Sequence, residues 1–140
     1  MKTVITYGTF DLLHVGHINL LKRARVMGDR LIVGLSTDAF NNKKHKHALM
    51  SFWERKIVLE SLRYVDIVIP ERSWGQKRSD IRRHGADILV MGSDWAGQFD
   101  ELSALCRVVY VPRTKGISTS ALKRYTGPRK KKPYRSSRAA

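Results

Sequence analysis

The sequence predicts an α/β fold in which a doubly wound, five-stranded parallel sheet carries helices on both faces. Short runs rich in Val and Ile alternate with longer segments whose apolar residues recur at helical spacing. The short runs are almost continuously hydrophobic, as strands buried on both faces are. Such alternation is typical of parallel sheets with helical crossovers. The expected strands are 3–7, 31–35, 66–69, 88–91 and 108–111.

Helices are expected between these strands, and two of them carry recognisable end signals. The first is expected over about 15–27, with Gly28 behind it as a stop. The second is expected over about 51–64, because Ser51 and Glu54 have the spacing of a capping box. Further helices are expected over about 73–84, over 98–105 and from residue 118 onward.

Length and composition restrict the class of protein. The 140 residues are enough for one domain with a buried core. No apolar run approaches the ~20 residues that a membrane helix needs, so we expect a cytoplasmic protein. The single cysteine, Cys106, lies in an apolar segment and is expected to be a buried thiol in a reducing compartment.

The formal net charge of +15 is distributed unevenly. The chain has eight basic and no acidic residues from Lys123 to its end. We therefore expect a folded domain over 1–125 and a basic tail over 126–140 that is disordered without a partner. A basic body suits a small anionic substrate, whereas a basic tail suits nucleic acid or an anionic membrane surface. The two interpretations do not exclude each other.

The first strand is followed by a loop that ends in His14-Val15-Gly16-His17. Ligands of such sheets bind beyond the carboxyl ends of the strands, and a helix N-terminus offers free N–H groups to an anion. Two imidazoles three residues apart project to one side of a helix and can stabilise charge on a reacting phosphorus. A zinc helix needs a different histidine spacing and a P-loop needs a Lys-Ser/Thr pair. Phosphate binding is therefore favoured.

A second anion-binding segment is expected after the fifth strand. Arg113 offers a planar fork for phosphate oxygens, and Gly116 permits a tight turn. The hydroxyl-bearing residues that follow are expected to begin a helix, where hydroxyls and free N–H groups converge on an anion. The hydroxyl-bearing residues are Ser118, Thr119 and Ser120. Together with the helix after the first strand, two helix N-termini would then face one polyphosphate.

The two motifs resemble those of the nucleotidylyltransferase superfamily, whose signature is a strand followed by H-x-G-H. The sequence Arg63-Tyr64-Val65-Asp66 and the run 113–120, similar to R-T-x-G-I-S-T-[ST], narrow the resemblance to the cytidylyltransferases. Other local runs look most like the bacterial glycerol-3-phosphate cytidylyltransferases. The resemblance implies a Rossmann-like fold and a homodimer. It also implies transfer from CTP to sn-glycerol 3-phosphate, giving CDP-glycerol and pyrophosphate, for wall teichoic acid or related polymer precursors.

The resemblance also implies roles for individual residues. His14, His17 and Arg113 are expected to be catalytic, by stabilising charge at the α-phosphorus. The acceptor is expected to contact Lys44, Lys77 and Arg55. No residue is expected to ligate a metal, and Mg²⁺ would be bound through the CTP phosphates. The expected CTP contacts are Thr9, Phe10, His14, Gly16, His17, Lys46, Asp94, Arg113, Thr114, Gly116, Ile117, Ser118, Thr119 and Ser120.

Several alternatives stay open at this point. The acceptor could instead be phosphoethanolamine, phosphocholine or a flavin phosphate, although a quaternary amine prefers aromatic or acidic neighbours, and Lys44 and Lys77 argue against one. Asp11 and Asp38 could touch ligand or only orient other side chains. We expect Trp53 and Trp74 to be packing residues. An alternative function of another class is nucleic-acid or anionic-membrane binding through the basic tail.

Overall fold

A computed structural model describes residues 1–125 and confirms the predicted fold class. One five-stranded parallel sheet has the order β3-β2-β1-β4-β5. The strand order reverses at β1, whose two neighbours are β2 and β4, and this creates the switch point at which such sheets bind ligands. The basic tail over 126–140 lies outside the described residues. The strands are β1 (Thr3–Gly8), β2 (Arg30–Ser36), β3 (Ile67–Glu71), β4 (Ile88–Gly92) and β5 (Arg107–Val111).

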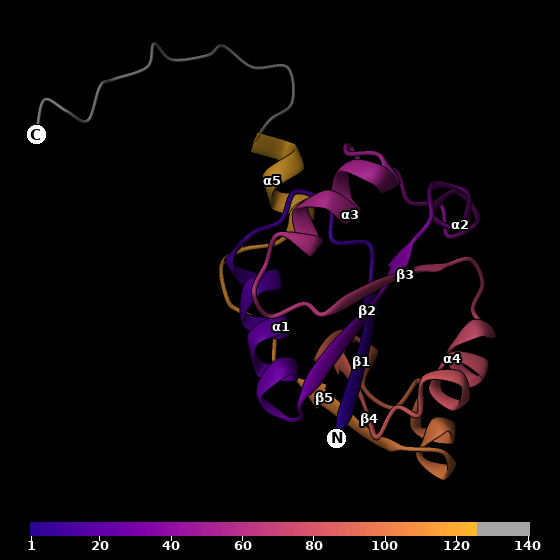
Figure 1. The fold of residues 1–140 in the computed structure, drawn as a ribbon. Helices are drawn as coiled ribbons and strands as arrows, with labels where there is room; N and C mark the ends of the chain where they lie inside the picture. The colour runs from indigo at the N-terminus through magenta and orange to yellow at the C-terminus, as the bar shows by residue number, and fades with distance from the viewer. Residues whose placement is uncertain (126–140) are drawn as a thin grey trace, which may run out of the picture.

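Helices cover both faces of the sheet, as expected. α1 (Val15–Val26) and α3 (Phe52–Glu60) lie on one side, and α4 (Gln76–His84) lies on the other (Figure 1). Leu21 of α1 and Leu59 of α3 share a buried cluster with Val33, whereas Ile81 of α4 shares a second cluster with Ile32. Because neighbouring strand residues point to opposite faces, β2 contributes to both cores.

Several element boundaries differ from the expected ones. A short helix, α2 (Asp38–Lys43), was not expected; Thr37 caps it by accepting the Phe40 N–H at 3.1 Å. The capping box at Ser51 is confirmed, but α3 ends at Glu60, where the Ser61 hydroxyl donates to a backbone carbonyl. The helix expected over 98–105 is a shorter 3₁₀ helix, η2 (Asp100–Ala104), and a 3₁₀ turn that was not expected, η1 (Ser93–Trp95), precedes it.

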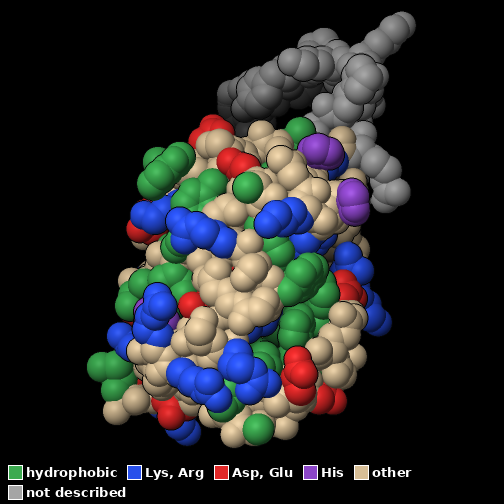
Figure 2. Space-filling view, turned by 90° about the vertical axis from the view of Figure 1, so that its right-hand side faces the viewer, with side chains coloured by type: hydrophobic (Ala, Val, Ile, Leu, Met, Phe, Trp, Pro, Cys, Tyr) green, Lys and Arg blue, Asp and Glu red, His purple; other side chains and the backbone are tan. Residues whose placement is uncertain are grey.

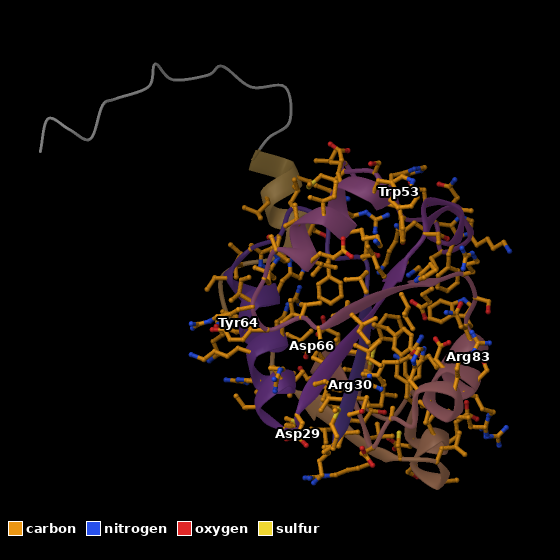
Figure 3. The ribbon with its side chains drawn as sticks, in the orientation of Figure 1. Asp29, Arg30, Trp53, Tyr64, Asp66 and Arg83 are labelled. Atoms are coloured by element: carbon orange, nitrogen blue, oxygen red, sulfur yellow. The ribbon has the colours of Figure 1, made fainter. Side chains whose placement is uncertain are left out.

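The expectation that Trp53 is a packing residue is wrong, whereas Trp74 does pack, edge-on against the Phe40 ring, although half of it is exposed. Trp53 is 67% exposed and projects from the top of α3 (Figure 3), and Trp74 is 52% exposed. The neighbouring Phe52 packs against the core in place of Trp53, because the two side chains leave the helix in different directions. The expected burial of Cys106 is confirmed.

The surface charge and the helix lengths bear on possible partners. Lys and Arg side chains are spread over the face seen in Figure 2, where hydrophobic and uncharged side chains separate them. None of the helices within residues 1–125 is long and apolar enough to span a bilayer.

Candidate active site

Two adjoining cavities open where the strands end. The first cavity, of about 310 Å³, lies among the start of α1, the end of β4 and the residues after β5. The second cavity, of about 470 Å³, lies among residues 44–48, the end of β3 and Trp74. Residues 7–10 and His17 border both cavities. A group bound in one cavity can therefore meet a group bound in the other beside His17.

The H-x-G-H sequence forms a capping box made of histidines. His14 is the N-cap of α1, and its Nδ1 accepts the Gly16 N–H at 3.0 Å. His17 Nδ1 in turn accepts the His14 N–H at 3.3 Å, and the two rings stack with centroids 3.9 Å apart. A Cβ on Gly16 would lie 2.8 Å from His14 Cε1, so the ring fits only over glycine.

This hydrogen bonding also sets the protonation of both rings. Because each Nδ1 accepts a backbone N–H, the neutral rings carry their proton on Nε2 and keep one N–H donor each. Burial, together with the nearby Arg113, lowers the pKa of His14. Burial, together with His14, lowers the pKa of His17 to about 4. Both imidazoles are therefore neutral hydrogen-bond donors at pH 7.

The loop between β1 and α1 is strained and held by Asp11. Phe10 and Leu12 have φ values of +50° and +48°, which non-glycine residues rarely adopt and which concentrate at functional sites. Asp11 is 2% exposed and accepts the N–H groups of Leu49 and Met50 at 2.8 and 3.1 Å. Asp11 thus anchors one wall of the second cavity to this loop.

The segment 113–120 closes the first cavity from the other side. The Arg113 guanidinium lies 3.5 Å from Asp94, and both side chains are more than half exposed. Asn19 of α1 donates to the Thr114 hydroxyl at 3.0 Å, and the Thr119 hydroxyl donates to the Asp11 carbonyl at 2.8 Å. These bonds tie the start of α5 (Thr119–Tyr125) to the H-x-G-H loop.

The structure brings most of the expected CTP contacts together around the first cavity. Lys46 borders the second cavity instead, and Gly116, at φ +82°, shapes the turn without lining either one. The residues gathered at the first cavity are Thr9, Phe10, His14, Gly16, His17, Asp94, Arg113, Thr114, Ile117, Ser118, Thr119 and Ser120.

Lys44 places an ammonium group at the second cavity. Its Nζ donates to the Ser36 hydroxyl at 2.9 Å and lies 4.5 Å from the centre of the Phe40 ring. Burial and the neighbouring Lys46 lower the pKa of Lys44 to about 8. The group is thus a cation at neutral pH that loses its charge as the pH rises past 8.

Lys77 also lines the second cavity, but its charge is already compensated. Its Nζ lies 2.6 Å from Glu71 Oε2, and the two side chains are 4% and 3% exposed. Sequence reasoning did not single out Glu71. Its position just beyond the end of an expected strand could have pointed to it, because ligands bind at that edge of such sheets. In the structure Glu71 lies opposite Ser36 in the register of β2 and β3.

Arg55 does not face either cavity, which corrects its expected contact with the acceptor. The side chain is fully buried and donates to the carbonyls of Thr9 and Ser36, both at 2.9 Å. It also donates to the Met50 carbonyl and to Asp38, at 3.0 and 2.7 Å. Arg55 therefore fastens the strand ends and the loop around the site from behind.

The remaining carboxylates of the motifs are structural as well. Asp38 accepts from Phe52 N–H and from Arg55. Asp66 accepts the Leu31 N–H at 2.7 Å and lies 3.2 Å from Arg25 of α1. Figure 3 shows Asp66 and Tyr64 on the α1 side of the molecule. In the part of the chain that is described, no three His, Cys, Asp or Glu side chains are grouped to hold a metal ion.

Comparisons with known proteins agree with this geometry. Residues 5–137 match the family model described as cytidylyltransferase-like. The chain is 59% identical over 123 residues to the glycerol-3-phosphate cytidylyltransferases of Staphylococcus aureus and Bacillus subtilis. These matches cover 88% of this chain and 93% and 95% of those proteins. A mouse ethanolamine-phosphate cytidylyltransferase is 31% identical over 121 residues, covering 82% of this chain and 30% of that one.

A solved structure shows the same fold at lower sequence identity. A lipopolysaccharide core biosynthesis protein from Thermoplasma volcanium superposes with a TM-score of 0.70 at 24% identity. The alignment covers 82% of this chain and 99% of that one. The family match, the two relatives at 59% identity and the histidine-capped helix facing the 113–120 segment lead to one conclusion: the chain belongs to the cytidylyltransferase-like family.

Proposed function

We propose that the protein transfers the cytidylyl group of CTP to sn-glycerol 3-phosphate, giving CDP-glycerol and pyrophosphate. The observation that carries this proposal is the pair of adjoining cavities with His17 on their common wall. CTP would occupy the first cavity and the acceptor phosphate the second, so that the two reacting groups meet between them.

The first cavity offers a group for each part of the nucleotide. Arg113 and the hydroxyls of Thr119 and Ser120 line it and would bind the phosphates. Asp94 would accept the amino group of cytosine, and Trp95 would pack on the base. CTP would bind as its Mg²⁺ complex, in which the metal neutralises charge on the departing pyrophosphate.

The reaction needs no general base. The second pKa of a phosphate monoester is near ~6, so the acceptor arrives as a dianion at neutral pH. One of its oxygens attacks the α-phosphorus in line while the bond to the bridging β-phosphate oxygen breaks. His14 and His17 would donate their Nε2 protons in hydrogen bonds to the α-phosphate oxygens, where negative charge builds up. Neither histidine has to gain or lose a proton.

The assignment of the acceptor rests on charge and on the relatives. Lys44 and Lys46 border the second cavity and would offset the repulsion between the two anions. The two relatives at 59% identity are named for glycerol 3-phosphate, and the relative named for ethanolamine phosphate is only 31% identical. Both observations favour an acceptor that carries a phosphate at one end and no charge at the other.

An acceptor panel tests the proposal. CTP and Mg²⁺ are incubated with glycerol 3-phosphate, phosphoethanolamine, phosphocholine or a flavin phosphate, and pyrophosphate release is followed. We expect the highest kcat/KM with glycerol 3-phosphate. Release with another acceptor but not with glycerol 3-phosphate would reassign the substrate, and no release with any of them would contradict nucleotidyl transfer.

The proposal extends to the subunit number of the protein, its location, the use of its product and the role of its basic tail. We propose a cytoplasmic homodimer whose CDP-glycerol supplies wall teichoic acid or a related polymer, with the basic tail contacting an anionic membrane or nucleic acid. Light scattering after gel filtration measures the subunit number. Deleting residues 127–140 should leave catalysis intact and weaken association with anionic vesicles or DNA; unchanged association would contradict the role of the tail.

A further inference from the structure

The ammonium group of Lys77 occupies a cage of aromatic rings beside the second cavity. Its Nζ lies 4.7 Å from the centre of the Tyr7 ring, 4.9 Å from Phe99 and 5.4 Å from Trp74. Glu71 completes the cage with a carboxylate oxygen at 2.6 Å. Three rings and one carboxylate around a buried cation form the type of site that proteins use to bind alkylammonium ligands.

The cage changes what Lys77 can do for an acceptor. Because Glu71 neutralises it, Lys77 adds little net attraction for a phosphate. By contrast, the ammonium of Lys44 is held by the Ser36 hydroxyl and the Phe40 ring rather than by a carboxylate at hydrogen-bond distance. Of these two lysines, Lys44 is the better partner for an incoming dianion.

The cage lies close to the expected place of the acceptor phosphate. The Nζ atoms of Lys44 and Lys77 lie 5.7 and 5.4 Å from the centre of the same Trp74 ring. All members of the cage also line the second cavity. The far end of a short acceptor whose phosphate binds Lys44 would therefore approach the cage.

We propose that Lys77 determines acceptor specificity by filling, with its own ammonium, a cation site that would otherwise receive the ammonium of an amino-alcohol phosphate. The cage rejects such acceptors because its rings and its carboxylate are already occupied by the ammonium of Lys77, so the ammonium of the acceptor would be left without partners, whereas a neutral polyol end does not need the cage. The inference rests on the proposed nucleotidyl transfer. The competing role, direct binding of the acceptor phosphate by Lys77, predicts a different result.

The test compares kcat/KM for glycerol 3-phosphate and phosphoethanolamine in the full chain and three variants. Lys77→Ala opens the cage, Lys77→Met keeps it filled without the charge, and the double variant Glu71→Gln/Lys77→Ala removes its carboxylate. We expect Lys77→Ala to shift the ratio of the two kcat/KM values toward phosphoethanolamine by about tenfold or more. The double variant should lose most of this shift, and Lys77→Met should show little of it.

An unchanged ratio in Lys77→Ala, or an equal shift in Lys77→Met, would overturn the inference. A loss of activity with glycerol 3-phosphate alone would instead support direct phosphate binding by Lys77. These results are distinguishable from failure of the proposed function, in which the unaltered protein itself would release no pyrophosphate with any acceptor.

A binding measurement keeps the inference testable without turnover. Thermal unfolding of Lys77→Ala is followed in methylammonium chloride and in potassium chloride of equal ionic strength. Methylammonium should raise the melting temperature of Lys77→Ala, or restore its folding if the variant unfolds alone, and should have no such effect on the unaltered protein. Equal behaviour of Lys77→Ala in the two salts would overturn the inference.

Discussion

The two cavities of the site are built in different ways. The first cavity is lined largely by two short runs of sequence, 14–17 and 113–120, and its two histidines are held by backbone N–H groups within the run 14–17. The walls of the second cavity are held by buried charged side chains that contact other elements: Arg55 of α3 donates to Thr9 after β1, and Lys77 of α4 pairs with Glu71 at the end of β3. We therefore expect changes at the first cavity to alter turnover, and changes behind the second to alter stability as well.

The largest effect is expected at the wall that the cavities share. His17→Ala removes a donor to the α-phosphate and should lower kcat by roughly 10²–10³-fold, measured by pyrophosphate release. His17→Gln, whose amide nitrogen can stand in for Nε2, should retain more activity than His17→Ala. His84→Ala, which lies on α4 away from both cavities, is the matched control. A kcat for His17→Ala within a few-fold of the parent would refute the proposed mechanism.

Arg55→Met tests the claim that the second cavity is supported from behind. The change leaves the buried carbonyls of Thr9 and Ser36 without their donor and should lower the free energy of unfolding by about 3 kcal/mol. Urea unfolding measures it. The adjacent Lys56→Met breaks a surface pair with Glu60 and a contact with the exposed Trp53 ring and should cost less than about 1 kcal/mol. Equal losses would contradict the role given to Arg55.

Gly16→Ala sharpens the account of the first cavity. A Cβ would lie 2.8 Å from the His14 ring and displace it, so kcat should fall by about tenfold with little change in stability. Gly75→Ala serves as the control, because a Cβ there meets no atom within 4 Å. If Gly16→Ala and Gly75→Ala had the same kcat, the close fit of His14 over glycine would have no functional meaning.

The pH dependence of the two KM values should distinguish the two cavities, with a smaller effect than the substitutions above. Lys44, with a pKa lowered to about 8, is charged below that pH and neutral above it. The KM for glycerol 3-phosphate should therefore rise several-fold between pH 7 and 9, whereas the KM for CTP should change less. Lys44→Arg keeps its charge and should abolish the rise. A rise that persists in Lys44→Arg would assign it to another group.

Histidine protonation should not limit the rate near neutral pH. The pKa of His17 is about 4, so its ring is neutral well below pH 7, and the pKa of His14 is lowered in the same direction by burial and by Arg113. With both substrates saturating, kcat should stay level from about pH 7 to 8, above the second pKa of the acceptor phosphate at ~6. A fall in kcat on the acid side of pH 7 that disappears in His14→Gln would show that a ring titrates there.

The same contrast explains how much of the molecule could be predicted from sequence. The fold class and the first cavity could be predicted because strand hydrophobicity, the H-x-G-H spacing and the 113–120 run are local patterns. The burial of Arg55 could not, because its partner Thr9 lies 46 positions away. Lys77 and Glu71 are only six positions apart, but their pairing depends on how the turn between β3 and α4 directs the two side chains, and hydrophobic periodicity carries no information on that.

The central claim is that the acceptor attacks the α-phosphorus of CTP between the two cavities. Phosphorus NMR of CTP, Mg²⁺ and glycerol 3-phosphate with the protein measures the products directly. We predict that CDP-glycerol and pyrophosphate appear in equal amounts as CTP disappears, and that His17→Ala slows both equally. Formation of CDP, which would mean attack at the γ-phosphorus, or of CMP without CDP-glycerol, would contradict the claim.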